Sequence, residues 1–285
     1  MNQLLTISFF ASTLAFALPI LLAALGELVG EKSGVINIGL EGQMLVGALA
    51  GAAVSFTLHN AALGLIMAMM AGVLLAGIFA LLVVTLRADA IVVGTGLNLF
   101  ALGLTGVLHR AISNRAMGGA YESQVLPEWV FVITSLLLIP LLWWGLQKTR
   151  LGLQLRASGE YPSAAEAAGA SVSKLRWAAT LFNGALCGAA GAFLSIANTN
   201  SFAENMTAGR GFIALAIVIF GRWNPLGATA AALLFGAANA AQFQLQSQLG
   251  TDFYPLLLAL PYVLTILTLA GFAGRTKAPA ALGKV

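Results

Sequence analysis

The sequence predicts an all-α protein, a polytopic transmembrane helical bundle of about nine spans. Apolar residues make up 59% of the 285 residues, charged residues only 8%, and the mean hydropathy is +0.92. Soluble domains carry about 25% charged residues. Apolar runs long enough to cross a bilayer core of about 30 Å recur along the chain. Glycine, which lets transmembrane helices approach closely, is abundant at 32 residues.

The apolar runs predict about nine spans, within a range of about eight to ten. We expect the first run to be a retained span and not a cleaved signal peptide, because no Lys or Arg precedes it. The seventh run is too short to cross the core alone. In chain order the predicted spans are Thr6–Leu25, Gly34–Phe56, Ala61–Leu86, Ala90–Leu108, Trp129–Leu146, Ala178–Asn198, Gly211–Gly221, Leu226–Gln244 and Tyr254–Phe272.

The distribution of Lys and Arg predicts the orientation of the bundle. The longest polar loop, 147–177, carries five of the 14 basic residues, and the positive-inside rule places it in the cytoplasm. Alternation of the spans then leaves only Arg110, Arg115 and Arg210 outside. The C-terminus is therefore predicted to be cytoplasmic. The net charge of +4 reflects membrane topology, and we expect no nucleic-acid partner.

The sequence has no pattern typical of a catalytic or metal site. A phosphate-binding loop, an H-E-x-x-H pattern and a cysteine pair are all missing, since Cys187 is the single cysteine. We therefore expect no covalent chemistry, no metal and no cofactor in this chain. Glu41 is the only ionisable residue predicted to lie away from a span end. Ion-driven carriers usually place ionisable groups within the membrane, so energy for uphill transport is expected from another polypeptide.

The loop 147–177 predicts a short cytoplasmic helix. Pro162 suits its first turn, and Gly169 is a natural C-terminal stop. The alanines between these two residues form a small-residue face that suits close docking against another protein. An ordinary interfacial connector explains the same residues equally well.

Three blocks together resemble the branched-chain amino acid/ribose permease superfamily of ABC importers. The run 31–42, EKSGVINIGLEG, is typical of the nucleoside and simple-sugar branch, and a second block is GRGFIALAIVIFGRWNPLGA, 209–228. The third block lies in the loop and resembles the coupling helix, the segment that contacts the ATPase. The coupling residues that the resemblance implies are Gly159, Glu160, Pro162, Ala164, Ala165 and Gly169.

The resemblance also implies partners and location. Permeases of this branch work in pairs, often a shorter chain with a longer one. Beside them are a cytoplasmic ATPase, which binds ATP and Mg, and an extracytoplasmic substrate-binding lipoprotein. This chain would be the shorter permease, a single domain over residues 1–285 in a bacterial plasma membrane. Nucleosides are the expected substrates. A ribose-type sugar, a branched-chain amino acid, and a self-contained secondary carrier or channel stay open as alternatives.

A nucleoside offers hydroxyl groups and a base edge, so its path needs amide, hydroxyl and aromatic side chains. Residues of these types within the predicted spans are candidates, and Asn98 is the best of them because it lies mid-span. Each candidate could instead hydrogen-bond a neighbouring helix, for about 0.6–2 kcal/mol. The candidates are Asn37, Glu41, Gln43, Thr95, Asn98, Phe100 and Asn183.

Overall fold

The computed structural model describes residues 7–115, 123–249, 263 and 277–284, and this part of the chain is helical without strands. Two π-helical turns, Leu81–Thr85 and Phe193–Asn198, extend α3 and α8. The helices are α1 (Ile7–Lys32), α2 (Leu40–Leu58), α3 (Ala61–Ala80), α4 (Ala90–Arg115), α5 (Glu128–Lys148), α6 (Arg150–Glu160), α7 (Pro162–Ala167), α8 (Val172–Ala192), α9 (Arg210–Phe220) and α10 (Pro225–Leu249).

Seven helical segments of the described part are long and apolar enough to cross a membrane. The prediction of an all-helical, multi-pass membrane protein is therefore confirmed, while the count of nine spans stays a prediction. The predicted span Gly211–Gly221 corresponds to the short helix α9. The predicted span Tyr254–Phe272 lies outside the described residues, apart from Val263.

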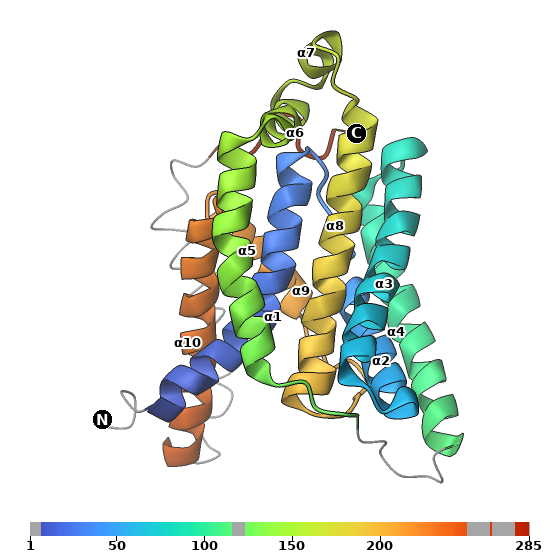
Figure 1. The fold of residues 1–285 in the computed structure, drawn as a ribbon, viewed down its shortest axis with the longest axis vertical. Coiled ribbons are helices and arrows are strands. Elements are labelled where there is room, and N and C mark those ends of the chain that lie inside the picture. The colour runs from blue at the N-terminus through green and yellow to red at the C-terminus, as the bar shows by residue number, and fades with distance from the viewer. Residues whose placement is uncertain (1–6, 116–122, 250–262, 264–276, 285) are drawn as a thin grey trace.

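Helices α2, α3 and α8 pack closely through glycine (Figure 1). Gly47 of α2 faces Gly188 of α8, where a Cβ on Gly47 would lie 2.6 Å from the Gly188 Cα. A Cβ on Gly72 of α3 would lie 2.9 Å from the Gly188 nitrogen. Real Cβ atoms do not approach other atoms this closely, so the three backbones can meet only where these positions lack side chains.

Helix α1 is longer than the first predicted span. The prediction that this span ends at Leu25 is wrong, because the helix continues to Lys32. Glu27 and Glu31 thereby lie inside the bundle, with side chains 0% and 1% exposed. The prediction that Glu41 is the only ionisable residue within the spans is therefore also wrong. Charged residues normally mark a span end, but here neighbouring helices surround the second half of α1 and supply polar partners.

The second predicted span is not one continuous helix. Residues 33–39 are non-helical, and they run from the end of the bundle that carries α6 and α7 into its interior (Figure 1). Helix α2 begins only at Leu40. This correction to the predicted span Gly34–Phe56 has a physical cause, since side chains from other helices bond the free backbone groups of the segment, as shown below.

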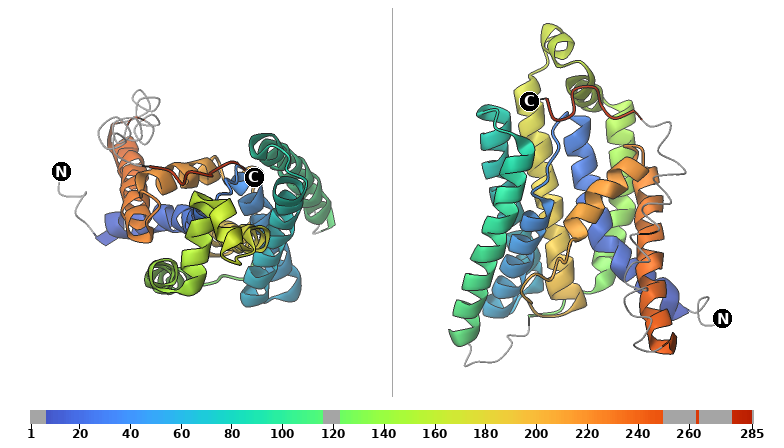
Figure 2. Two further views of the ribbon diagram at one scale, coloured as in Figure 1. Left: turned by 90° about the horizontal axis from the view of Figure 1, so that it is seen from above. Right: turned by 180° about the vertical axis from the view of Figure 1, so that it is seen from behind.

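Helix α9 also follows a non-helical segment, but it runs in the direction opposite to α2. The non-helical residues 199–209 precede it, and α9 then runs toward the end that carries α6 and α7 (Figure 2). Its 11 residues cover about 16 Å at 1.5 Å per residue, roughly half of the bilayer core. Arg210, predicted to lie in an outer loop, is instead the first residue of α9 and is partly buried. Helices α2 and α9 thus start inside the bundle and point in opposite directions.

The segment Lys277–Lys284 lies at the same end of the bundle as α6 and α7 (Figure 1). The orientation prediction also puts the loop 147–177 and the C-terminus on one side. Which side of the membrane this end faces stays a prediction.

Candidate functional site

Glu41 joins the two interrupted helices. It is the second residue of α2, and its carboxylate accepts hydrogen bonds from the backbone N–H groups of Gly209 and Gly211, both at 2.7 Å. The first N–H groups of a helix have no partner within that helix, and the positive end of the helix dipole attracts a carboxylate. A Cβ on Gly211 would lie 2.7 Å from the Glu41 Cα, so glycine is needed there. One side chain therefore caps α9 and holds both helix starts together.

The non-helical segment before α2 takes its hydrogen-bond partners from buried side chains, as unpaired backbone groups inside a membrane require. The Asn37 N–H donates to Glu27 Oε1 at 2.8 Å, and Asn37 Nδ2 donates to Gln43 Oε1 at 3.2 Å. The other Glu27 oxygen, Oε2, accepts from Asn183 of α8. All four side chains are buried, and together they tie α1, α2 and α8 to this segment.

Asn98 on α4 also bonds the backbone where the non-helical segment 33–39 meets α2. Its Oδ1 accepts from the Gly42 N–H at 2.8 Å, and its Nδ2 donates to the Ile38 carbonyl at 2.9 Å. The side chain thus bridges the last residues before α2 and the first turn of α2. One amide proton and one lone pair remain for another partner. A place for Asn98 on a substrate path stays a prediction.

The buried carboxylates of α1, Glu27 and Glu31, also belong to the candidate site, although they were not among the residues predicted from the sequence. Glu31 Oε2 accepts from the indole N–H of Trp223, in the turn between α9 and α10. Helix α9 is therefore held by Glu41 at its start and by Glu31 just after its end. A signal was present in the sequence, since Glu27 and Glu31 are four residues apart and share one helix face at the end of an unbroken apolar run.

The predicted path residues fall into three groups. Asn37, Gln43 and Asn183 belong to the buried network around Glu27. Phe100 lies apart from the others, 53% exposed on α4. The remaining three line a cavity.

This cavity lies between α2, α4 and α9 and has a volume of about 300 Å³. Pockets that hold small molecules usually measure about 300–1,000 Å³. The cavity therefore sits directly beside the junction that Glu41 makes, and it is large enough for a small organic ligand. Its lining residues are Glu41, Gly42, Leu45, Thr95, Asn98, Leu99, Leu102, Asn205 and Phe212.

The short helix predicted in the loop 147–177 is present as α7, and its coupling role stays a prediction. Pro162 is its first residue, and Gly169 follows its end with φ +85°, a conformation that glycine adopts without strain. Ala165 is buried, whereas Ala164 and Gly169 are exposed. The short helix therefore presents small side chains away from the bundle.

Gly159 and Glu160, the other predicted coupling residues, face a different environment. Gly159 is buried at the end of α6, and a Cβ there would lie 3.1 Å from the Gly34 nitrogen. Glu160 is exposed, and its Oε2 accepts from the Ala280 N–H at 3.2 Å. Gly159 thus belongs to the contact between α6 and the bundle.

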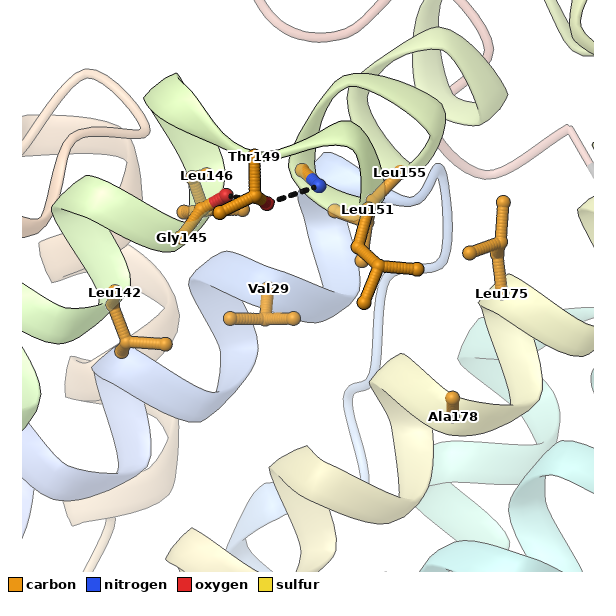
Figure 3. A pocket seen from close by; sticks show the side chains of 10 residues that line it. Val29, Leu142, Gly145, Leu146, Thr149, Leu151, Leu155, Leu175 and Ala178 are labelled. Atoms are coloured by element: carbon orange, nitrogen blue, oxygen red, sulfur yellow. Dashed lines mark hydrogen bonds between the residues drawn. The ribbon is translucent and has the colours of Figure 1, made fainter.

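A second cavity of about 390 Å³ lies beneath α6, between α1, α5 and α8 (Figure 3). The Thr149 hydroxyl accepts from the Gly152 N–H and donates to the Gly145 carbonyl. Its polar group is therefore already bonded, and the other side chains of the lining are apolar. None of the predicted path residues lines this cavity. The lining residues are Val29, Leu142, Gly145, Leu146, Thr149, Leu151, Gly152, Leu155, Leu175 and Ala178.

Arg110 of α4 and Glu204 of the segment before α9 form an exposed ion pair with Nε and Oε1 3.0 Å apart. The hydrogen bond from Arg110, together with its charge, lowers the pKa of the Glu204 carboxyl. Solvent screens such exposed pairs, so this one contributes little to stability. The described residues contain no group of three His, Cys, Asp or Glu side chains that could hold a metal ion.

Comparison with known families fits this architecture. A family model described as "Branched-chain amino acid transport system / permease component" matches residues 9–269. The chain belongs to this permease family. No solved structure was found to match the permease.

Curated relatives of the permease cover most of its length. The guanosine ABC transporter permease protein NupQ of Bacillus subtilis is 37% identical over 95% of this chain and 94% of its own. The nucleoside ABC transporter permease protein NupC of Lactococcus lactis is 35% identical over 96% and 94%. The putative glucose ABC transporter permease protein TsgC13 of Haloferax volcanii is 35% identical over 83% and 77%.

The geometry suits this permease to binding and movement. Discontinuous helices place polar backbone ends inside a membrane where other protein groups bond them, and transporters use such ends at the level where substrate passes. Here the two helix starts meet at one carboxylate, beside a cavity. A shift of either helix would have to rearrange the hydrogen bonds of Glu41.

Proposed function

We propose that this permease is the shorter permease subunit of an ATP-driven ABC importer for nucleosides, in the plasma membrane of a bacterium. The observation that carries the proposal is the match, at 35–37% identity over 95–96% of the chain, to relatives named as guanosine and nucleoside permeases. The three motif blocks support it, because they form the α2 interruption, the α7 region, and α9 with its flanking turns.

The energy for transport would come from a separate cytoplasmic ATPase that binds ATP and Mg. Helix α7 supports this role, since Ser163, Ala164 and Ala167 are small, exposed side chains that permit close docking. A second, longer permease chain would complete the pore. A substrate-binding lipoprotein would deliver nucleosides at the end of the bundle opposite α7.

A sugar is the second candidate substrate, because TsgC13 is named as a putative glucose permease. Nucleosides and sugars share hydroxyl groups, and a nucleoside adds a flat base. Phe212 at the wall of the cavity favours a nucleoside, since an aromatic side chain can stack on a base for about 1–3 kcal/mol.

Uptake measurements test the substrate. We expect cells that lack this permease to lose uptake of labelled guanosine and to regain it when the gene is returned, while uptake of labelled glucose and leucine stays unchanged. Unchanged uptake of every nucleoside, with loss of glucose or leucine uptake, would replace the nucleoside by that substrate.

Reconstitution tests the source of energy. We expect nucleoside transport in liposomes only when the permease is combined with its ATPase, the second permease, the binding protein and ATP. Transport by the permease alone, driven by an ion gradient, would show that it is a self-contained carrier.

A further inference from the structure

We infer that the segment Lys277–Lys284 is a positioning element for energy coupling. It joins the end of α6, next to the predicted coupling helix α7, to the non-helical backbone that leads into α2. The inference rests on the proposed function, since coupling needs an ATPase that acts on α7. Nothing in the sequence pattern of these residues singles them out. Their importance comes from the backbone hydrogen bonds that they make.

The segment bonds both sides of a junction, at which the end of α6 meets the turn after α1. The Ala281 N–H donates to the Gly159 carbonyl, at the end of α6, at 2.9 Å. The Gly283 N–H donates to the Gly34 carbonyl, in the turn after α1, at 3.0 Å. Ala281 is only 7% exposed, so water competes little for its bond. Two residues of one short segment therefore hold α6 against the turn after α1.

Side chains reinforce the same junction. Arg176, at the start of α8, donates from Nε to the Ser33 carbonyl at 3.4 Å and from Nη2 to the Lys284 carbonyl at 3.3 Å. Its guanidinium thus bridges the turn after α1 and the segment itself. The Ser158 hydroxyl of α6 lies 3.2 Å from the same Ser33 carbonyl. Four parts of the chain, distant in sequence, meet at these few backbone groups.

The junction leads directly to the interrupted helices. Beyond Gly34 the backbone passes through Asn37 and Ile38, which Glu27 and Asn98 hold by hydrogen bonds. It then enters α2, where Glu41 caps α9. A displacement of α6 at the junction would therefore reach the start of both interrupted helices through a short stretch of backbone.

Helix α6 is suited to transmit such a displacement. At its first turn, Gly152 packs against Leu146 of α5, where a Cβ would lie 2.7 Å from the Leu146 Cα. At its last turn it is fixed by the junction described above. The cavity of Figure 3 lies beneath its first half, along Leu151, Gly152 and Leu155. Leu155, at the middle of the helix, packs against the apolar core as well, so a push on α7 would displace the last turn of α6 and the junction there most directly.

The complete transporter in liposomes provides the test, with guanosine uptake and ATP hydrolysis measured in the same vesicles. Ala281→Pro removes the N–H that bonds Gly159. We expect it to lower the guanosine transported per ATP hydrolysed by about fivefold or more, the scale of coupling between distant sites. The matched control is Ala278→Pro, an exposed position whose N–H donates to no other described residue, and its ratio should equal that of the wild type.

Arg176→Lys is a second, milder variant. It keeps the positive charge and loses the planar fork that bridges two carbonyl groups. We expect a smaller fall in the same ratio, with an unchanged KM for guanosine, because neither position lines the cavity beside Glu41. A merely structural role would instead reduce the amount of assembled transporter and lower uptake and hydrolysis in parallel.

The outcomes separate the two ideas. Wild-type ratios in assembled Ala281→Pro and Arg176→Lys transporters would overturn the positioning role and leave the proposed function intact. If Ala281→Pro fails to assemble, a wild-type ratio in Arg176→Lys alone overturns that role. A wild-type transporter that shows no ATP-driven nucleoside uptake would overturn the proposed function itself.

Discussion

Among single residues, Glu27 has the least usual environment. It is fully buried, and its partners within the described residues are the neutral donors Asn37 and Asn183. An acidic residue at the centre of a transmembrane helix costs about 2.5–3.5 kcal/mol on insertion scales. Hydrogen bonds to a carboxylate contribute about 1.5–3 kcal/mol each. The amide and backbone donors around Glu27 are therefore needed to keep it inside the bundle.

Asn183→Ala tests this dependence. The change leaves Glu27 Oε2 without its side-chain donor, so we expect a loss of about 1–3 kcal/mol of stability and a lower melting temperature in detergent. A thiol-reactive dye can report the melting, because Cys187 is the single cysteine and is buried in the folded protein.

The control for this experiment is Thr95→Ala, whose exposed hydroxyl bonds only carbonyls of its own helix. Its melting temperature should match that of the wild type. If Asn183→Ala melts at the wild-type temperature too, Glu27 does not depend on the amide.

At the scale of elements, contacts between helices rest on glycine where backbones touch and on polar side chains where helices are interrupted. Both devices let backbone groups of different helices come close. Glycine does so by omission of a side chain, as at Gly188 between α3 and α8. Glu41 does so by bonding helix ends.

Gly188→Ala should destabilise the bundle. A Cβ there would lie 2.8 Å from the Ala68 carbonyl carbon and 2.9 Å from the Met69 Cα. Backbone atoms cannot move aside cheaply, so we expect a loss of about 1–3 kcal/mol or more. Gly96→Ala is the matched control, since a Cβ at Gly96 meets nothing within 4 Å. Alanine is the better helix former, so this control should gain up to about 1 kcal/mol. Equal melting temperatures for the two variants would contradict the packing argument.

Ala164→Trp tests the docking of α7. The large side chain would project from an exposed small-residue position and should keep the ATPase away without disturbing the bundle. We expect normal melting of the permease and loss of ATPase from the purified complex. Thr57→Trp, exposed near the opposite end of the bundle, should retain the ATPase. Normal ATPase recovery with Ala164→Trp would remove α7 from the docking surface.

At the scale of the whole molecule, the two ends of the helical bundle are built from different elements. One end gathers α6, α7 and the segment Lys277–Lys284, and the α2–α3 turn lies at the other (Figure 1). The positive-inside rule assigns the first end to the cytoplasm. Under the proposed function, transport would link an ATPase at this end to a substrate that arrives at the other.

Cysteine labelling in intact cells checks this orientation. A membrane-impermeant maleimide should label Thr57→Cys from outside and should leave Ser163→Cys and Lys277→Cys unlabelled. Inverted vesicles should show the reverse pattern. Buried Cys187 gives little background. Labelling of Ser163→Cys in intact cells would invert the orientation.

Local signals explain what could be predicted from the sequence. Long apolar runs predict helices, because length and hydropathy alone decide whether a helix can cross a bilayer. Pro162 and Gly169 delimit α7 correctly, since each acts on its own backbone. The cavity beside Glu41 includes Thr95 and Asn98, which polarity alone had selected.

The interruptions could not be predicted in this way. Most residues from Gly34 to Phe56 are apolar, so the sequence predicts one continuous helix there. The backbone before Leu40 is non-helical because side chains distant in sequence bond it. One of them is Asn98, whose bonds to Gly42 and Ile38 span 56 and 60 residues of sequence. The buried state of Glu27 likewise depends on Asn183, on a helix much later in the chain.

The bond between Glu27 and Asn183 also constrains how the protein is made. The two residues are 156 positions apart, so at about 5–20 residues per second the ribosome needs roughly 8–30 s between them. During that interval the second half of α1 carries two acidic side chains without the amide that later bonds Glu27. The second half of α1 can therefore take its final position in the bilayer only after α8 has emerged from the ribosome. Biogenesis of this permease must include a stage in which the earliest helix waits, near the insertion machinery or the lipid headgroups, for one of the later ones.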